Sequence, residues 1–453
     1  MIKIDSLHVK MFGLIILQLT VALGFAIYAN KFDLVFINNI ILAFALFIFT
    51  MLPLVYANYN VSLKKILIAM ILSKAIIFLL VYFHSHHLSE GFYLNYMVGD
   101  DRKYTDLALF YQSDFSMLLK NEKNYYGLPY AAVLTLFTKF FVWTDLFRFV
   151  QHILLLISVY YVYRFILNTL KDKFIAQLSA VIYAFNPMLN IFSTFLFKDT
   201  ILVFLLSYFL FVASENKLSI YSLVSMGAIV IVAYYIRPFL IPVFLLGLIL
   251  FKVKIRLNSF RAVMSLGTIF ILVLGLSYLL KDQLLRNLDL IALMDTRISN
   301  VTSILTSDIK VSFTQILVVA IFFLDLPPAN FVNMETPWFS QEGLVTFPRA
   351  YNYALSIFMY IGIFFSLSRT NFNKNSFALL VLMFVMIVGM SLTGQVLSDR
   401  HKVMLYPLVM YFVAMGLKSS NARGYHILFG TVTTITVALQ IYYSVLRFQS
   451  YGY

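Results

Sequence analysis

Residues 219–251 read SIYSLVSMGAIVIVAYYIRPFLIPVFLLGLILF, and this stretch decides the class of fold. Arg237 is its only charged residue, and the step from Arg237 to Pro238 divides it into two apolar runs, 219–235 and 238–251. Apolar runs of about 17–25 residues with few or no charges are typical of helices that cross a lipid bilayer. The stretch therefore predicts two membrane helices joined by a short turn.

The rest of the sequence has the same character. Of its 453 residues, 61% are hydrophobic and only 12% are charged, and the mean hydropathy is +0.87. A soluble domain of this length needs far more polar residues to cover its surface. Cysteine is absent, which excludes a disulfide framework, a thiolate metal site and a cysteine nucleophile. We expect an all-α, polytopic membrane protein that forms one integral membrane domain over residues 1–453.

About 13 transmembrane helices are expected, because a run of about 20 apolar residues spans the hydrocarbon core. We interpret the apolar segment 309–325 as a re-entrant or interfacial helix, since a further span there would move the later basic clusters to the opposite side. Such a segment is tolerated where other parts of the protein cover it. The predicted spans are 11–29, 34–57, 64–83, 145–166, 174–192, 199–214, 219–235, 238–251, 262–280, 351–368, 376–393, 402–417 and 425–445.

The formal net charge of +14 comes from lysines and arginines that gather between the apolar runs. Cytoplasmic loops of membrane proteins carry such an excess of cations, and this distribution argues against nucleic acid as a partner. We therefore predict a multi-pass protein of a bacterial plasma membrane, in contact with membrane lipids, with its N-terminus in the cytoplasm. The basic clusters are Lys64-Lys65 and those within 171–173, 252–256, 369–374 and 418–423.

This orientation leaves two long extracytoplasmic segments, 84–144 and 281–350. The first contains an amphipathic stretch, 104–119, and then the residues Gly-Leu-Pro-Tyr at 127–130, followed by a short apolar segment that ends at Trp143. Amphipathic helices of this kind lie in the plane of the membrane. We expect the first segment to hold polar side chains at the depth of the lipid headgroups.

An acidic pair stands in this first segment. Asp100 and Asp101 are followed directly by Arg102 and Lys103. Neighbouring carboxylates repel each other, which favours protonation of one of them and suits it to act as a general base. Together they could instead hold a divalent cation, Mg²⁺ or Mn²⁺, through oxygen ligands. A solvated turn in which one aspartate caps a helix is the non-functional alternative.

A second set of polar residues falls at the outer ends of predicted spans, where cations are normally scarce. Guanidinium and ammonium groups bind phosphate oxygens, so the cations of this set are candidates for holding a phosphate opposite the acidic pair. Each of them singly could also be an anchor that reaches the membrane surface. Lys74 differs because it lies within a predicted span, where it either reaches the surface or pairs inside the bundle. The set consists of Lys198, Asp199, Arg237, Asp399, Arg400, His401 and Lys402.

These residues resemble the integral-membrane glycosyltransferases of the GT-C fold. The resemblance rests on 99–101 with Tyr104, on 127–130, on 183–200 and on 399–402. It implies a sugar donor linked to polyprenyl phosphate and a glycan or lipid acceptor. In that family the acidic loop usually follows the first span, whereas here it follows the third predicted span. The resemblance implies that Asp100 or Asp101 is the catalytic base, that Lys198, Arg237 and Arg400 hold the donor phosphate, and that Arg102, Lys103, Asp199 and His401 are further candidates for substrate binding.

Two other functions stay open on the sequence alone. An O-antigen or capsule polymerase also acts outside the membrane, on sugars linked to undecaprenyl pyrophosphate, and has a similar number of spans. A lipid-linked oligosaccharide flippase is the non-enzymatic alternative, but transporters of this size tend to have polar or broken helices near the membrane midplane. Because most ionisable residues here gather at one face and the spans themselves are poor in charge, we expect a glycosyltransferase of cell-surface polysaccharide synthesis that works on the extracytoplasmic face.

Overall fold

The computed structural model describes residues 63–89, 99–111, 128–140, 144–215, 219–237, 240–252, 341–368, 374–392 and 402–450, together with Gly13. Within these ranges the chain forms helices and turns and contains no strand, which confirms the all-α class. The predicted spans 11–29, 34–57 and 262–280, the segment 309–325, and the candidates Asp399, Arg400 and His401 lie outside the described residues.

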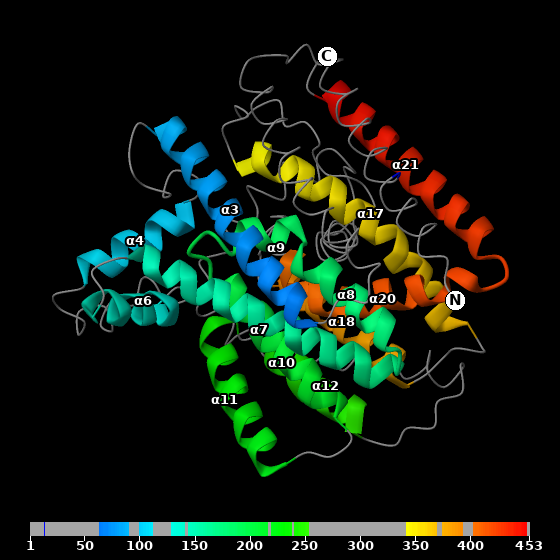
Figure 1. Cartoon of the computed structure of the whole chain (residues 1–453), viewed down its shortest axis with the longest axis horizontal. Coiled ribbons are helices and arrows are strands. Elements are labelled where there is room, and N and C mark those ends of the chain that lie inside the picture. Colours follow the sequence, from blue (N-terminus) through cyan, green and yellow to red (C-terminus); the bar gives the residue numbers. More distant parts are fainter. Residues whose placement is uncertain are drawn as a thin grey trace.

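Figure 1 shows the helices in their order along the chain, and most of them coincide with predicted spans. They are α3 (Leu63–Ser89), α4 (Gly99–Phe110), α6 (Leu128–Phe140), α7 (Thr144–Leu170), α8 (Lys173–Ala184), α9 (Pro187–Phe192), α10 (Asp199–Ser214), α11 (Ile220–Ile236), α12 (Leu240–Lys252), α17 (Gln341–Leu367), α18 (Lys374–Leu392), η4 (Val403–Leu405), α20 (Tyr406–Lys418), η5 (Ser419–Asn421) and α21 (Tyr425–Ser450).

Two boundaries differ from the prediction. The predicted span 174–192 is not one helix, because α8 ends before Asn186 and α9 begins at Pro187. Asparagine favours a helix N-cap, and proline lacks the N–H that would continue the preceding helix. The predicted extracytoplasmic segment 281–350 ends in helix, since α17 begins at Gln341.

Two helical stretches are long and apolar enough to cross a membrane by length and composition. They are Phe147–Leu170 in α7 and Val403–Asn421, which joins η4, α20 and η5. Several shorter apolar helices accompany them in the described ranges. The expected number of about 13 spans is therefore not confirmed and stays a prediction.

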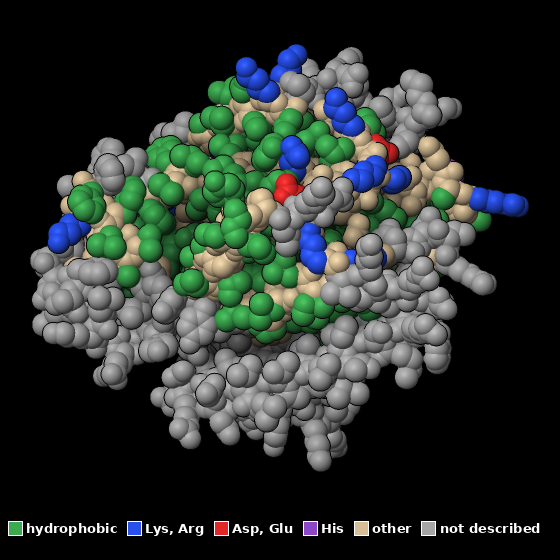
Figure 2. All heavy atoms as spheres, turned by 90° about the horizontal axis from the view of Figure 1, so that it is seen from below, with side chains coloured by type: hydrophobic (Ala, Val, Ile, Leu, Met, Phe, Trp, Pro, Cys, Tyr) green, Lys and Arg blue, Asp and Glu red, His purple; other side chains and the backbone are tan. Residues whose placement is uncertain are grey.

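One face of α7 is apolar and exposed. Phe149, Ile153, Ile157 and Tyr160 recur every three or four residues, and each has at least 36% of its surface exposed. Large apolar side chains are also exposed on α3, α11 and α12, and Figure 2 shows a broad hydrophobic area with lysines and arginines around part of its margin. Apolar surface of this extent marks contact with lipid or with another protein.

Several predicted basic clusters meet at one end of the bundle. There, α7 and α10 end side by side, because Asn168 Nδ2 donates to Ser214 Oγ at 3.2 Å. Three lysines donate to backbone carbonyls near the ends of neighbouring helices, where cations complement the helix dipole. Burial lowers the pKa of two of them, Lys252 and Lys374. The bonds run from Lys252 to Glu215 O, from Lys374 to Phe251 O at 2.6 Å and from Lys418 to Leu170 O at 3.1 Å.

The buried apolar side chains form two clusters. The larger cluster holds together the helices of the main bundle, from α7 to α12 and from α17 to α21, with part of α3. The smaller cluster joins α4 and α6 to the start of α7, and α4 and α6 lie beside each other at one edge of the molecule in Figure 1. The members of the smaller cluster are Tyr104, Ala108, Tyr111, Tyr130, Ala131, Leu134, Phe147 and Leu196.

Helices α17 and α20 approach each other closely at a pair of glycines. A Cβ atom added to Gly362 would lie 1.8 Å from the carbonyl oxygen of Phe412, and one added to Gly416 would lie 2.1 Å from that of Phe358. Real side chains do not approach so closely, so only glycine fits at either position. Small residues allow this kind of backbone approach in membrane helix pairs.

We expect Gly362→Ala and Gly416→Ala each to lower the free energy of unfolding by about 3 kcal/mol, the upper end of ordinary overpacking costs, because the obstructing atom is backbone and cannot rotate away. Denaturant unfolding of the purified protein in detergent measures the change. Gly430→Ala in α21 is the matched control, since a Cβ there meets nothing within 4 Å. A loss of the same size in the control would contradict the close contact.

Candidate functional site

The chain between α8 and α10 leaves the helical path inside the protein. α8 has 12 residues and α10 has 16, so at about 1.5 Å per residue neither would cross a hydrocarbon core of about 30 Å by itself. Between them lie the short α9 and the turn 193–198. Every residue of 181–200 is buried, so the predicted outer turn is enclosed by other helices and does not lie on the surface.

Two asparagine side chains form hydrogen bonds with backbone groups at this break between α8 and α10. The side-chain oxygen of Asn186 accepts from the N–H groups of Met188 at 2.9 Å and Leu189 at 3.2 Å. Asn190 Nδ2 donates to the carbonyls of Ala184 at 3.0 Å and Asn186 at 2.8 Å. Unpaired backbone groups are costly in an apolar interior, so these side chains make the irregular path stable.

Asn186 also ties the break to the C-terminal helices. Its Nδ2 donates to the side-chain oxygen of Asn352 in α17 at 2.9 Å. Asn352 Nδ2 in turn donates to the hydroxyl of Tyr406 at the start of α20. All three side chains are buried. The start of α9 is therefore linked through Asn352 to α17 and α20, two helices far away in the sequence.

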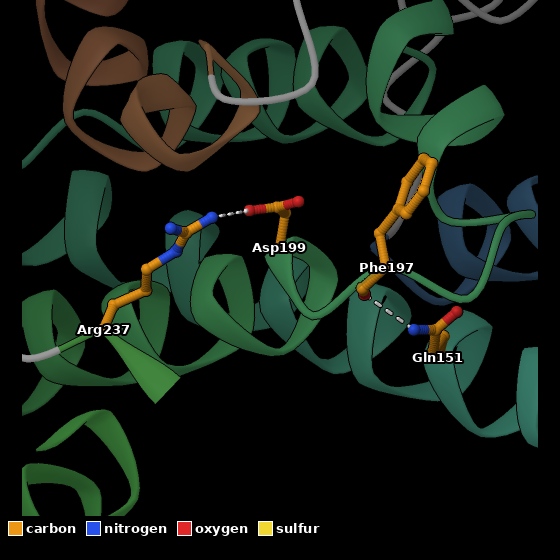
Figure 3. A network of polar contacts seen from close by, with 4 residues as sticks. All are labelled: Gln151, Phe197, Asp199 and Arg237. Carbon is orange, nitrogen blue, oxygen red and sulfur yellow. Dashed lines mark hydrogen bonds and ion pairs between the residues drawn. The ribbon is translucent and has the colours of Figure 1, made fainter. Parts of the chain in front are cut away.

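The break ends in a buried ion pair. Arg237 Nη2 lies 3.6 Å from Asp199 Oδ1, and the two side chains are 4% and 2% exposed. Asp199 stands in the first turn of α10, where the helix dipole favours a negative charge, and Arg237 directly follows α11. Figure 3 shows the two side chains pointing toward each other across the start of α10. The predicted candidates Lys198, Asp199 and Arg237 are thus brought together.

Helix α7 holds the turn 193–198 from one side. Arg148 Nη1 donates to the carbonyl of Thr194 at 2.8 Å, and Gln151 Nε2 donates to the carbonyl of Phe197 at 2.8 Å. Neither Arg148 nor Gln151 was among the candidates predicted from the sequence. A signal was present, because Arg148, Gln151 and His152 stand within the predicted apolar span 145–166 at a spacing that places them on one helical face.

Lys74 of α3 holds the turn from a second side. Its Nζ lies 2.6 Å from Ser193 Oγ and 3.1 Å from His152 Nδ1. Lys74 is 4% exposed, so of the two alternatives for this lysine the structure supports pairing inside the bundle. The hydroxyl of Ser193 also donates to the carbonyl of Asn190 at 3.0 Å, which links α3 to the short helix α9.

Lys402 is a further buried cation of the predicted set. It is 3% exposed, and its Nζ lies 5.7 Å from the centre of the Tyr353 ring in α17, a favourable arrangement for a cation. The helix η4 that follows it packs against α10. This contact places the start of the C-terminal helices beside the helix that carries Asp199.

The acidic pair lies in the first turn of a helix. Asp100, Asp101, Arg102 and Lys103 follow Gly99, the first residue of α4. This placement favours negative charge, because the N–H groups of a helix start are positive. The structure describes the backbone of these four residues, and their side chains lie outside the described part. Their proposed roles therefore stay predictions.

A chain of contacts joins α4 to the turn 193–198. The rings of Tyr104 in α4 and Tyr130 in α6 meet edge to face with centres 4.8 Å apart. The hydroxyl of Tyr130 accepts from Gln151 Nε2 at 2.9 Å, and the same nitrogen donates to Phe197. The helix with the acidic pair and the segment with the ion pair are therefore parts of one connected region.

Positive charge predominates inside the described part of the protein. Its buried charged side chains include only one carboxylate, that of Asp199. Charges taken out of water are costly unless charges of opposite sign approach them. Each buried charge of this region accordingly interacts with neighbouring groups. The buried cations of lysine and arginine are Lys74, Arg148, Lys198, Arg237 and Lys402.

A metal site is not apparent in the described residues. They contain no group of three or more His, Cys, Asp or Glu side chains that could hold a metal ion. The suggested Mg²⁺ or Mn²⁺ site at Asp100 and Asp101 involves two carboxylates only and stays a prediction.

No protein-family model, curated protein or solved structure is similar to this chain at a significant level.

Breaking the ion pair should be costly. We expect Asp199→Asn to lower the free energy of unfolding by about 3–5 kcal/mol, because it leaves the buried guanidinium of Arg237 without its carboxylate. The double variant with Arg237→Gln should recover part of this loss in denaturant unfolding. Glu215→Gln, which lies just past the other end of α10 and is partly exposed, should change stability by less than about 1 kcal/mol. Losses that simply add in the double variant would argue against the pair.

Proposed function

We propose that the protein is a membrane glycosyltransferase with about 13 transmembrane helices in a GT-C-like arrangement. It would transfer a sugar from a polyprenyl-phosphate-linked donor to a glycan or lipid acceptor on the extracytoplasmic face. The observation that supports this most is the buried Arg237–Asp199 pair beside Lys198, because it offers a guanidinium inside a helix bundle with exposed apolar faces.

The cations suit the leaving phosphate of such a donor. A guanidinium can make two parallel hydrogen bonds to phosphate oxygens, and Arg237 stands at the end of α11 beside the start of α10. Negative charge grows on the phosphate as its bond to the sugar breaks, and a preorganised cation in a site without water stabilises it most at that moment. Lys198 directly precedes Asp199 in the sequence, and Lys402 lies just before η4, which packs on α10.

The acidic pair supplies the other half of the reaction. One carboxylate, of Asp100 or Asp101, accepts the proton of the acceptor hydroxyl. The hydroxyl oxygen then forms a bond to the anomeric carbon of the sugar, and the bond from that carbon to the phosphate oxygen breaks. The contacts from Tyr104 through Tyr130 and Gln151 support this division of roles, because they join α4 to the turn that precedes Asp199.

The exposed apolar faces suit the lipid part of the donor. α11 exposes Ile220, Tyr221, Leu223 and Val224, and it ends at Arg237. A polyprenyl chain is apolar along its whole length, so it could lie against such a face while its phosphate reaches the cation. The same residues would serve a lipid pyrophosphate, which is the donor of an O-antigen or capsule polymerase.

The flippase alternative gains one observation from the structure. The break at 185–198 is buried, and interrupted helices with buried polar residues are typical of transporters. Two buried cations within predicted spans, Lys74 and Arg148, also weaken the expectation that the spans themselves are poor in charge. Transfer of sugar, as opposed to movement of an unchanged lipid, distinguishes the two functions.

The acidic pair can be tested directly. In membranes with a labelled pool of polyprenyl-linked sugars, we expect Asp100→Asn or Asp101→Asn to lower the rate of transfer by about 10²–10⁴-fold, the usual contribution of a general base. Asp106→Asn is the matched control, since Asp106 is exposed on the same helix, and it should keep a rate near that of the wild type. Full activity in both variants of the pair would remove the base from α4.

A separate variant tests the proposed phosphate site. Arg237→Lys keeps the positive charge but loses the paired hydrogen bonds, so we expect it to raise KM for the donor and to lower kcat while the protein stays folded. A ladder of repeat units as the wild-type product would identify a polymerase. Movement of lipid-linked oligosaccharide between leaflets without any transfer would identify a flippase.

The predicted sidedness can be measured because the chain contains no cysteine. Asp106 in α4 and Asn421 between α20 and α21 are both exposed. In intact cells, a membrane-impermeant maleimide should label Asp106→Cys and leave Asn421→Cys unlabelled until the cells are opened. The reverse pattern would place the acidic pair in the cytoplasm and overturn an extracytoplasmic reaction.

A further inference from the structure

The turn 193–198 lies where the two apolar clusters meet. Leu196 packs in the smaller cluster with Tyr104 of α4, whereas its neighbour Phe197 packs in the larger one. Two residues further on, Asp199 begins α10 and forms the ion pair. The turn 193–198 therefore contacts both the cluster that holds α4 and the cluster that holds α10 and α11, the helices of the ion pair.

Gln151 fastens this piece of backbone. Its side chain is fully buried, and its Nε2 donates both to the carbonyl of Phe197 at 2.8 Å and to the hydroxyl of Tyr130 at 2.9 Å. Because a backbone carbonyl can only accept a hydrogen bond, the nitrogen of the amide must face Phe197. Figure 3 shows Gln151 reaching from α7 to this carbonyl. The side-chain amide nitrogen of Gln151 thus links the turn 193–198 to α6.

From α6 the contacts continue to the acidic helix. Tyr130 is 2% exposed and packs edge to face on Tyr104, which is 5% exposed. Tyr104 lies about one helical turn after Asp100 and Asp101 in α4. Each of these contacts joins buried groups. A shift of the turn 193–198 is therefore passed on to α6 and α4, because no solvent lies between them to fill the space.

We propose that Gln151 is a positioning residue that couples occupation of the Arg237 site to the placement of the acidic helix α4. The inference rests on the proposed function, in which a lipid phosphate is the ligand of Arg237. In this inference, binding of the donor completes the site. The general base reaches its working position only when Arg237 holds the leaving phosphate.

The ion pair gives the coupling its driving force. A phosphate that binds Arg237 competes with Asp199 for the same guanidinium and therefore shifts the start of α10. Only Lys198 separates Asp199 from Phe197, so the Phe197 carbonyl moves with it. Losing this acceptor would leave a buried N–H of Gln151 unpaired, which is unfavourable. Gln151 follows the carbonyl and takes Tyr130 and α4 with it.

Hydrogen–deuterium exchange of the purified full chain in detergent tests this coupling. The probe is decaprenyl phosphate, with decaprenol as the phosphate-free control, and binding is followed independently by the midpoint of thermal unfolding. In the wild type, decaprenyl phosphate should slow the exchange of amides in 99–111 by about fivefold, the effect of one additional buried hydrogen bond. Decaprenol should leave this exchange unchanged.

The decisive variant is Gln151→Met, which keeps the length of the side chain and removes its hydrogen bonds. It should still gain thermal stability from decaprenyl phosphate, but the exchange of 99–111 should no longer respond. Gln177→Met, the same change at a partly buried position of α8, should behave as the wild type. If Gln151→Met does not fold, Tyr130→Phe takes its place, because it removes only the hydroxyl that Gln151 contacts.

The outcomes separate this inference from the proposed function. Binding without any change in 99–111, or an equal change in Gln151→Met and in the wild type, would show that Gln151 does not couple the two parts. Failure of decaprenyl phosphate to raise the midpoint of the wild type would instead overturn the lipid-phosphate site, and the coupling with it.

Discussion

A polypeptide that leaves the helical path inside an apolar bundle must give every freed backbone group a hydrogen-bond partner. The segment 185–198 meets this requirement with side chains from several directions. Asn186 and Asn190 serve the turn before α9, while Arg148 and Gln151 serve the carbonyls before α10. The position of the ion pair depends on these contacts, because α10 begins where the turn ends.

Of these side chains Arg148 is charged, and Lys74, Lys198, Arg237 and Lys402 are further lysines and arginines buried in the described ranges. Arginine and lysine carry donors only, so residues recruited to bind carbonyl oxygens also bring charge into the bundle. Asp199 offsets part of it next to Arg237. The cations enclosed beside the interrupted helix connect this architecture to the phosphate-binding function proposed for the protein.

Apolar runs in the sequence predicted the all-α class and most of the described helices, because the thickness of a bilayer requires a run of about 20 apolar residues in each helix that crosses it. They did not predict the break at Asn186, since the residues on both sides of it are apolar and a count of hydrophobic residues runs through it. The predicted sidedness placed Lys198, Asp199 and Arg237 at the same ends of their spans, but the pairing of Arg237 with Asp199 depends on how α10 and α11 pack. Gln151 was missed because a single glutamine in an apolar helix belongs to no motif, and its role arises only from contacts with residues far away in sequence.

The two apolar clusters have a consequence for how the protein loses its structure. α4 and α6 are held by a small core of their own, which meets the main bundle through Phe147 and Leu196. Regions with few buried contacts open at lower free energy than the rest of a protein. We therefore expect this pair of helices to open before the main bundle on heating, and to assemble after the bundle has formed the surface on which it docks.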